Sequence, residues 1–174
     1  IGDSVMIFFG DPDTKGAKKD AIACCQMAME MLTFLENNQQ HFQDMYNFPE
    51  KLEIRVGIHN GLCNVGNFGS AQRLDYTAIG RTVNVAARLE QAAPKNSILV
   101  SSAIRNLIKN KFETSSPIEV KAKGIDKPIA SYVLNRQESL NTKVIKELDG
   151  LKLEYDPKKI NKNKLLKIIS ELKG

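Results

Sequence analysis

Residues 52–59 alternate strictly between two kinds of side chain, and this pattern constrains the fold more than any other. Apolar residues take every second position, and polar residues or glycine take the rest: Leu52, Ile54, Val56 and Ile58 against Glu53, Arg55, Gly57 and His59. Successive side chains of a strand point to opposite faces, so the pattern predicts a half-buried strand. Asn60-Gly61 follows at once, and this dipeptide is the strongest short signal for a hairpin turn. We therefore predict a hairpin over residues 52–65 at the centre of a sheet.

Other strands are predicted by short apolar or alternating runs. Residues 5–9 are wholly apolar and are followed by Gly10-Asp11-Pro12-Asp13, which indicates a buried strand and then a turn. Further strands are expected at residues 73–79, 98–100, 118–120 and 130–134.

Helices are predicted between these strands. A first helix carries an apolar stripe at spacings of three and four, made of Ala21, Cys24, Cys25, Ala28, Met31, Leu32 and Leu35. A second is expected over residues 82–93, and a third runs to about Ile108 with Ser101 or Ser102 as its N-cap. Strands and helices alternate but hairpins interrupt them, so we predict an α+β fold with one mixed sheet and helices packed on one face.

The composition divides the chain into two parts. Apolar residues make up 42% of the 174 residues, which suffices for the core of one domain. Lys residues crowd after position 140, so we attribute much of the formal charge of +5 to a basic tail. We predict a domain over residues 1–136 and a basic C-terminal extension over residues 137–174. No run of about 18 apolar residues occurs, so no transmembrane helix is expected.

The cysteines and histidines favour structural roles. Cys24 and Cys25 lie in the apolar helical stripe and have no metal-ligand spacing with Cys63, so we expect them to pack in the core of a protein in a reducing compartment. His41 and His59 lack catalytic or ligand partners at a useful spacing. We expect His59 to be structural or at the surface.

Two places at the ends of the predicted domain carry residues that suit a binding site. Asp3 follows Gly2 ahead of the apolar run; it suits a turn, and it also suits a hard cation such as Mg²⁺. Lys121 opens a charged stretch at residues 121–127, which is consistent with a solvated hairpin or with contact to a chain of phosphates. The local sequence does not decide between these alternatives.

A third place is the predicted helix over residues 82–93. Its start, Thr82-Val83-Asn84-Val85, is poor helix-forming material, which indicates a constraint other than helix propensity. Asn84 and Arg88 are four residues apart and therefore share one helix face. Taken alone, Asn84 is consistent with a solvated polar residue, and Arg88 with a side chain whose aliphatic part covers apolar surface. Together they offer an amide and a forked cation, which suit a sugar and a phosphate.

Together, these elements resemble the class III adenylyl/guanylyl cyclase catalytic domain, in particular its bacterial members. The matching pieces occur in family order at residues 1–10 (IGDSVMIFFG), 55–61 (RVGIHNG), 65–70 (VGNFGS), 75–90 (DYTAIGRTVNVAARLE) and 120–124 (VKAKG). The central piece is specific, and the ordered set over residues 1 to about 135 is more so. The resemblance implies a ferredoxin-like mixed sheet and the conversion of ATP to 3′,5′-cyclic AMP and pyrophosphate in intracellular signal transduction.

The resemblance implies substrate-binding roles for three residues. Thr77 falls where adenylyl cyclases carry Asp or Thr to read adenine and where guanylyl cyclases usually have Cys, so ATP is the expected substrate. Asp75 shares the strand face of Thr77 and is a weaker candidate for contact with the base. Lys121 matches the Lys that contacts the distal phosphates.

The resemblance implies catalytic and metal-binding roles for three more. Asn84 matches the Asn that positions the ribose, and Arg88 matches the Arg that stabilises charge on the α-phosphate in the transition state. Asp3 matches the second of two aspartates that hold two Mg²⁺ (or Mn²⁺) ions. The family works as a homodimer with active sites at the interface, where one chain supplies the metal aspartates and the other supplies the remaining residues. We also expect an upstream sensor domain in the parent chain. The catalytic domain is expected in the cytoplasm, either in a cytoplasmic protein or as the cytoplasmic part of a membrane-bound one.

The sequence departs from the family pattern at its start. The segment that carries the family's first metal aspartate, and the Lys that contacts the purine, have no counterpart ahead of Ile1. The predicted domain is therefore expected to lack the family's first strand and helices, and the chain alone is expected to be inactive.

Three alternatives compete with this interpretation. One is a catalytically inactive cyclase-homology domain for regulation or dimerisation; retention of Asp3, Asn84, Arg88 and Lys121 argues against it. Another is a guanylate cyclase, which Thr77 disfavours. The third is a nucleic-acid-binding module, which needs an open strand surface with aromatic residues. Aromatic residues make up only 6% of the chain, and Phe8 and Phe9 lie in a wholly apolar run, so no nucleic-acid partner is expected.

Overall fold

The structure is a computed structural model that describes residues 3–70, 72–120, 128–138, 144–148, 151–155 and 170. The chain falls into two compact units, Ile1–Gln137 and Glu138–Gly174. In the second unit, β8 (Val144–Leu148) and β9 (Leu151–Tyr155) pair as an antiparallel ladder. The remaining elements belong to the first unit, apart from the last residue of β7 (Ile129–Glu138).

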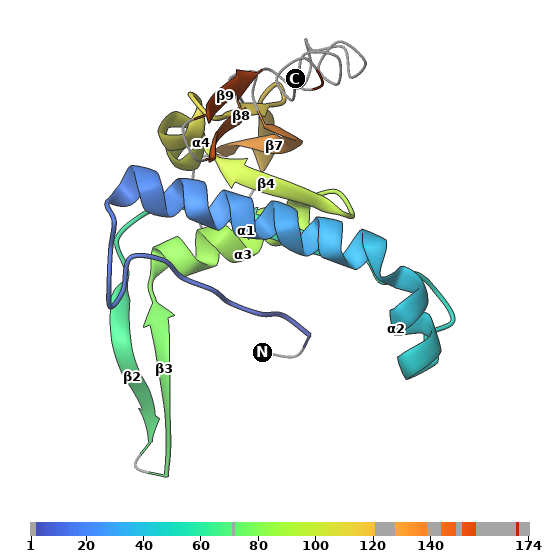
Figure 1. Cartoon of the computed structure of the whole chain (residues 1–174). Helices are drawn as coiled ribbons and strands as arrows, with labels where there is room; N and C mark the ends of the chain where they lie inside the picture. The colour runs from blue at the N-terminus through green and yellow to red at the C-terminus, as the bar shows by residue number, and fades with distance from the viewer. Residues whose placement is uncertain are drawn as a thin grey trace. The chain divides into compact units, whose positions relative to one another are not determined.

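A mixed sheet forms the centre of the first unit (Figure 1). β1 (Arg55–Ile58) pairs parallel with β4 (Ser97–Ser101), and β4 pairs antiparallel with β7. β7 also pairs with β5 (Phe112–Thr114) and, antiparallel, with β6 (Ile118–Val120). The strands predicted at residues 98–100, 118–120 and 130–134 are confirmed, whereas β5 was not predicted.

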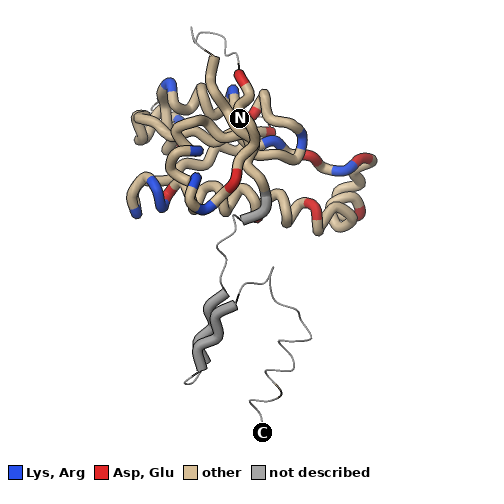
Figure 2. Tube along the Cα trace, turned by 90° about the horizontal axis from the view of Figure 1, so that it is seen from above, with Lys and Arg blue, Asp and Glu red and all other residues tan. Residues whose placement is uncertain are grey.

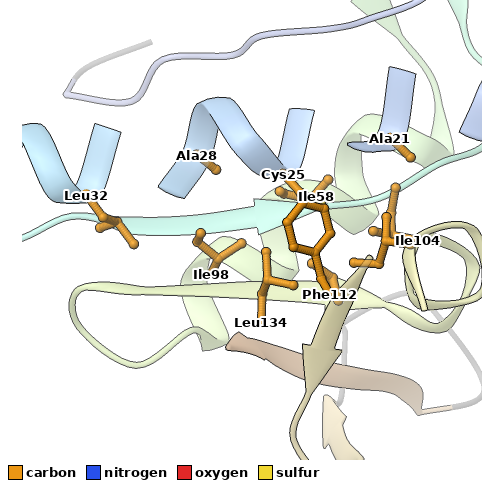
Figure 3. Packing of buried hydrophobic residues seen from close by; sticks show 11 residues of the cluster. Ala21, Cys25, Ala28, Leu32, Ile58, Ile98, Ile104, Phe112 and Leu134 are labelled. Atoms are coloured by element: carbon orange, nitrogen blue, oxygen red, sulfur yellow. The ribbon is translucent and has the colours of Figure 1, made fainter. Parts of the chain in front are cut away.

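Helix α1 (Ala17–Asn37) covers one face of this sheet. The apolar stripe predicted for it supplies the buried residues Ala21, Cys25, Ala28, Leu32 and Leu35. Four of these, from Ala21 to Leu32, point toward a cluster of side chains from β1, β4, β7, the start of β5 and α4 (Ser102–Ile108), shown in Figure 3: Ile58, Ile98, Ile104, Phe112 and Leu134. Ser101 caps α4, because its hydroxyl accepts from the Ile104 amide. The predicted cap is confirmed, and so is the predicted stripe except at Met31, which is exposed.

A further helix, α3 (Arg81–Ala92), packs on the opposite face. Leu99 points into a second cluster with Val85, Leu89 and Val120, whereas its neighbours Ile98 and Val100 point toward α1. β4 is buried on both faces, since residues 98–101 are all buried, and such a strand needs a layer on each side. The α+β class with a mixed sheet is confirmed, but α3 adds a second helical layer to the expected single one.

β2 (Asn64–Ser70) and β3 (Arg73–Ile79) form a separate antiparallel pair that extends as an arm from the sheet (Figure 1). The hairpin predicted over residues 52–65 is therefore wrong, although its first strand exists as β1. A two-residue hairpin turn needs positive φ at its first central residue, and neither Asn60 nor Gly61 has a positive φ. After β1 the chain instead runs close to the start of α3 before it enters β2. The Thr82 hydroxyl of α3 donates to the Leu62 carbonyl of this segment at 2.5 Å.

Residues 5–9 do not form the buried strand that their apolar run predicts. They carry no regular structure, and the exposed fraction of Val5 is 80%. Strand geometry requires a hydrogen-bonded neighbour, and within the described part of the chain no strand pairs with this segment.

The remaining features include one further helix and the three cysteines. α2 (Gln39–Tyr46) was not predicted; the Gln39 side chain forms two hydrogen bonds with the backbone of Leu52, at 2.8 and 2.9 Å. Burial raises the pKa of the Cys24 thiol to about 11 and that of Cys25 to about 12, so both pack as apolar side chains, as expected.

Lys and Arg are interspersed with Asp and Glu along the first unit (Figure 2). Among the described helices, none has the length and apolar character needed to cross a membrane.

Candidate active site

Gly80 joins strand β3 directly to helix α3, so four of the predicted site residues, Asp75, Thr77, Asn84 and Arg88, lie on two consecutive elements. Its φ of 149° lies in a region that residues with a side chain rarely adopt. The Asn84 amide donates to the Gly80 carbonyl at 3.4 Å, and no side chain caps the helix here. The chain therefore passes from the strand that carries Thr77 to the helix that carries Asn84 without an intervening loop.

Helix α3 buries one face and leaves the other free for a ligand. Val85 and Leu89 are buried, with exposed fractions of 6% and 0%. Asn84 is exposed and Arg88 is half-buried. Because α3 spans both positions, Asn84 and Arg88 lie one turn apart on the side away from the core. This is the relation that their four-residue spacing predicts.

The guanidinium of Arg88 has a neutral partner. Its Nη1 donates to Oε1 of Gln91 at 2.8 Å. Within the described residues, the ion pairs are Arg55 with Glu90, Arg73 with Asp75, and Lys95 with Glu53, and none includes Arg88. The positive charge of Arg88 is therefore not neutralised by a carboxylate of the described chain. Sequence reasoning missed Gln91, although its three-residue spacing from Arg88 on one helix is a signal that could have found it.

Asp75 and Thr77 lie on one face of β3, as alternation in a strand requires. Thr77 is half-buried and stands opposite Gly66 of β2. Glycine has no side chain, but the ring of Phe68, two residues along β2, lies 3.9 Å from where a Cβ on Gly66 would be, so a side chain of β2 reaches this position. Asp75 is exposed and pairs with Arg73 on its own strand, with 3.5 Å between Arg73 Nε and Asp75 Oδ2. The structure thus leaves Thr77 half-buried and gives Asp75 a competing partner.

Asp3 does not lie on β3 or α3, and the structure does not describe Lys121. Asp3 is exposed in the N-terminal segment. Throughout the described ranges, no group of three or more His, Cys, Asp or Glu side chains is placed to hold a metal ion. Asp3 offers one oxygen ligand of the kind that Mg²⁺ prefers, so the described residues do not by themselves make a site for two metal ions. The predicted pair of Mg²⁺ (or Mn²⁺) ions stays a prediction.

Tyr76 ties the N-terminal segment to β3, which sequence reasoning missed. It lies between Asp75 and Thr77 and so faces the opposite side of the strand. Its hydroxyl donates to the Asp11 carboxylate, and its ring lies 6.1 Å from that of Phe8, centroid to centroid. The hydrogen bond to Asp11 raises the pKa of Tyr76. One face of β3 therefore holds the N-terminal segment, and the other carries the residues predicted to read the base.

His59 is structural, as expected. It is half-buried just after β1, and 2.8 Å separates its Nδ1 from the Ser101 hydroxyl oxygen. Burial lowers the pKa of His59, because it disfavours the charged imidazolium. The Ser101 hydroxyl accepts from the Ile104 amide, so its proton is available to donate to His59. This bond joins the end of β1 to the start of α4.

Comparison with known proteins assigns these features to one family. The family model described as the adenylate and guanylate cyclase catalytic domain matches residues 1–136. Adenylate cyclase 1 of Rhizobium meliloti (strain 1021) is 35% identical over 147 residues, which cover 81% of this chain and 21% of that protein. An adenylate cyclase of Anabaena cylindrica is 32% identical over 137 residues, which cover 76% of this chain and 26% of that protein.

A solved structure agrees with both relatives. The adenylyl cyclase CyaB from P. aeruginosa superposes with a TM-score of 0.72 at 42% sequence identity, over 78% of this chain and 68% of that one. The chain spans about a quarter or less of the length of the two curated relatives it matches.

Proposed function

This chain belongs to the adenylate and guanylate cyclase catalytic domain family, and we propose that it is the catalytic part of an adenylate cyclase. The observation that carries the proposal is the match of the family model over residues 1–136, which includes the outward pair Asn84 and Arg88 on α3. The adenylyl cyclase CyaB, at 42% identity, supports adenosine rather than guanosine nucleotides. Residues 1–136 are the proposed catalytic domain, and residues 137–174 are a basic extension.

The reaction is an intramolecular phosphoryl transfer. The 3′-oxygen of ATP forms a bond to the α-phosphorus, the bond from that phosphorus to the pyrophosphate oxygen breaks, and the hydroxyl proton is lost. Such reactions depend on positioning and on stabilisation of the charge that develops on the phosphate. We assign charge stabilisation to Arg88, whose guanidinium carries several fixed donors and pairs with no described carboxylate. Asn84, one turn away on the exposed face, is assigned to the ribose.

Thr77 is the proposed reader of the base. Its hydroxyl can donate or accept a hydrogen bond, and it lies half-buried on β3, the strand that Gly80 joins directly to α3. Asp75 is the second candidate, and Lys121 is assigned to the distal phosphates. Enzymes of this family use divalent metal ions, and Asp3 is the proposed ligand in this chain; no step derived for Arg88, Asn84 or Thr77 depends on that assignment.

A competition assay tests the substrate. The full-length protein is incubated with equal concentrations of ATP and GTP, and both cyclic products are quantified by mass spectrometry. We expect cyclic AMP to dominate. Thr77→Cys should lower the ratio of cyclic AMP to cyclic GMP by about tenfold, which corresponds to roughly 1.4 kcal/mol of discrimination. Equal or greater formation of cyclic GMP by the wild-type protein would assign it to the guanylate cyclases instead.

We further propose a homodimer with active sites at the interface. Asp3 lies on the N-terminal segment and outside any described cluster of metal ligands, which supports a site completed by a second chain. Mixing inactive Asp3→Ala and Arg88→Ala proteins should then restore about a quarter of the wild-type rate, because half the dimers are mixed and each carries one intact site of two. A mixture as inactive as its components would contradict the shared site.

We also propose a cytoplasmic location and a sensor domain elsewhere in the protein, each from a different observation. Cys24, Cys25 and Cys63 are free, which supports a reducing cytoplasm; cell fractionation tests this. The two curated relatives are much longer than the matched part, which supports a sensor domain elsewhere in the protein. The sequence of the complete encoded protein tests that proposal.

A further inference from the structure

The side chain of Gln91 approaches Arg88 from the same exposed face of α3. Arg88 Nη1 donates to Gln91 Oε1 at 2.8 Å. The two residues are three apart, a spacing that brings side chains together on a helix. No other hydrogen bond of the Arg88 side chain is formed within the described residues.

The backbone at Gln91 is itself held to the sheet. Arg55 of β1 donates from Nη1 to the Gln91 carbonyl at 3.3 Å, and its Nε lies 3.4 Å from Oε1 of Glu90. Gly57 of β1 lies so close to α3 that an added Cβ would be 2.2 Å from the Glu90 amide nitrogen. The backbone that carries the Gln91 side chain, and with it the Oε1 acceptor, is therefore held by contacts with β1.

The chemistry of this acceptor suits a guanidinium that must attract a phosphate. An amide oxygen orients one N–H of Arg88 and leaves the positive charge and the other donors available. A carboxylate at the same position would pair with the guanidinium and oppose its attraction for a phosphate. An arginine held in advance also loses less side-chain entropy when the substrate arrives.

We infer that Gln91 is a positioning residue that holds the Arg88 guanidinium in place for the α-phosphate. The inference rests on the proposed function and deepens it: Gln91 acts on the reaction only through Arg88. Its removal lowers kcat and leaves KM for the nucleotide nearly unchanged, because Arg88 meets a charge that develops in the transition state.

The test is a double-mutant cycle in the full-length protein. Gln91→Met keeps the length of the side chain and removes the acceptor. We expect kcat to fall about threefold to tenfold, the scale for one hydrogen bond, with KM within about twofold. In an Arg88→Ala background, Gln91→Met should change kcat by less than about twofold, since the residue through which it acts is gone.

A matched control comes from α2. Gln40 donates from Nε2 to Asp44 Oδ1 at 2.8 Å on that exposed helix, so Gln40→Met removes the same kind of bond away from β3 and α3. It should keep the wild-type kcat. Wild-type kcat in Gln91→Met overturns the inference alone, and so does an equal loss of kcat with and without Arg88. A wild-type protein that forms no cyclic nucleotide overturns the proposed function and this inference together.

Discussion

Arg88 combines two properties that a phosphate-binding arginine needs, and both follow from its place on α3. Its neighbour Leu89 is buried and holds the helix against the sheet, while Arg88 itself lies on the outer side. Its described partner is the neutral amide of Gln91. One hydrogen bond therefore orients the guanidinium, and no carboxylate of the described residues pairs with it.

Replacement of Arg88 tests this role at the scale of the residue. Arg88→Ala in the full-length protein should lower kcat by about 10²–10³-fold, the scale for one group that stabilises transition-state charge. KM for ATP should change little, because the interaction strengthens only as the charge develops. Initial rates over a range of ATP concentrations measure both constants.

Arg105→Ala is the control for this substitution. Arg105 also lies on a helix, but its side chain contacts the Tyr132 ring and the Thr114 hydroxyl, so kcat should stay near the wild-type value. An Arg88→Ala enzyme with normal kcat and a raised KM would make Arg88 a ground-state binding residue and refute its assignment.

Part of the site was predictable from the sequence, and physical reasons separate that part from the rest. The shared face of Asn84 and Arg88 follows from helix periodicity, and that of Asp75 and Thr77 from strand alternation. Periodicity also brings Gln91 next to Arg88 and Arg73 next to Asp75, but it does not determine which of the possible partners each side chain selects. The roles assigned to Asp3 and Lys121 stay predictions.

The contact between β1 and α3 is a tight constraint at the scale of the elements. Gly57 lies where an added Cβ would be 2.2 Å from the Glu90 nitrogen and 2.3 Å from the Ala86 carbonyl oxygen. Both atoms belong to the helix backbone, so the clash cannot be relieved by the rotation of a side chain. Strand and helix can therefore pack at this distance only because residue 57 has no side chain.

We predict that Gly57→Ala destabilises the protein by about 3 kcal/mol, the upper part of the usual range for overpacking. Urea unfolding monitored by circular dichroism measures the change. Gly66→Ala is the matched control, because the nearest atom to its added Cβ is 3.9 Å away; its free energy of unfolding should stay within about 0.5 kcal/mol of wild type. Equal stability of the two variants would show that α3 does not press on β1.

The burial of His59 predicts a pH dependence of stability. Burial lowers the pKa of folded His59 below the ordinary value of 6.5. Below pH 6.5 the unfolded chain therefore binds a proton at His59 that the folded chain does not bind. The stability that the neutral His59 contributes is fully present above that pH and is lost as the pH falls toward the folded pKa. The free energy of unfolding of His59→Gln should fall less steeply from pH 6.5 to 5 than that of wild type. Parallel curves for the two proteins would contradict the prediction.

The elements show where local sequence was sufficient and where it was not. β3 spans the predicted residues, and α3 begins and ends within one residue of its prediction, because periodicity and Gly80 act locally. The hairpin over residues 52–65 and the strand at residues 5–9 failed for a different reason. Both depend on which distant segment supplies the hydrogen-bonding partner, and in β1 that partner is β4, about 40 residues away.

At the scale of the whole molecule, a fold shared by one family supports one proposed reaction. The first unit carries the mixed sheet, the β2–β3 arm and α3, and the family model covers residues 1–136. The residues assigned to the base, the ribose and the α-phosphate lie on β3 and α3, which Gly80 connects. The central claim is that these residues belong to an enzyme that cyclises ATP.

Product analysis tests that claim most directly. The purified full-length protein is incubated with ATP and Mg²⁺ or Mn²⁺, and the nucleotide products and pyrophosphate are quantified over time. The account predicts 3′,5′-cyclic AMP and pyrophosphate in equal amounts, because one bond forms and one breaks within a single ATP molecule. Formation of ADP or AMP without cyclic AMP, or no consumption of ATP with either metal ion, would contradict it.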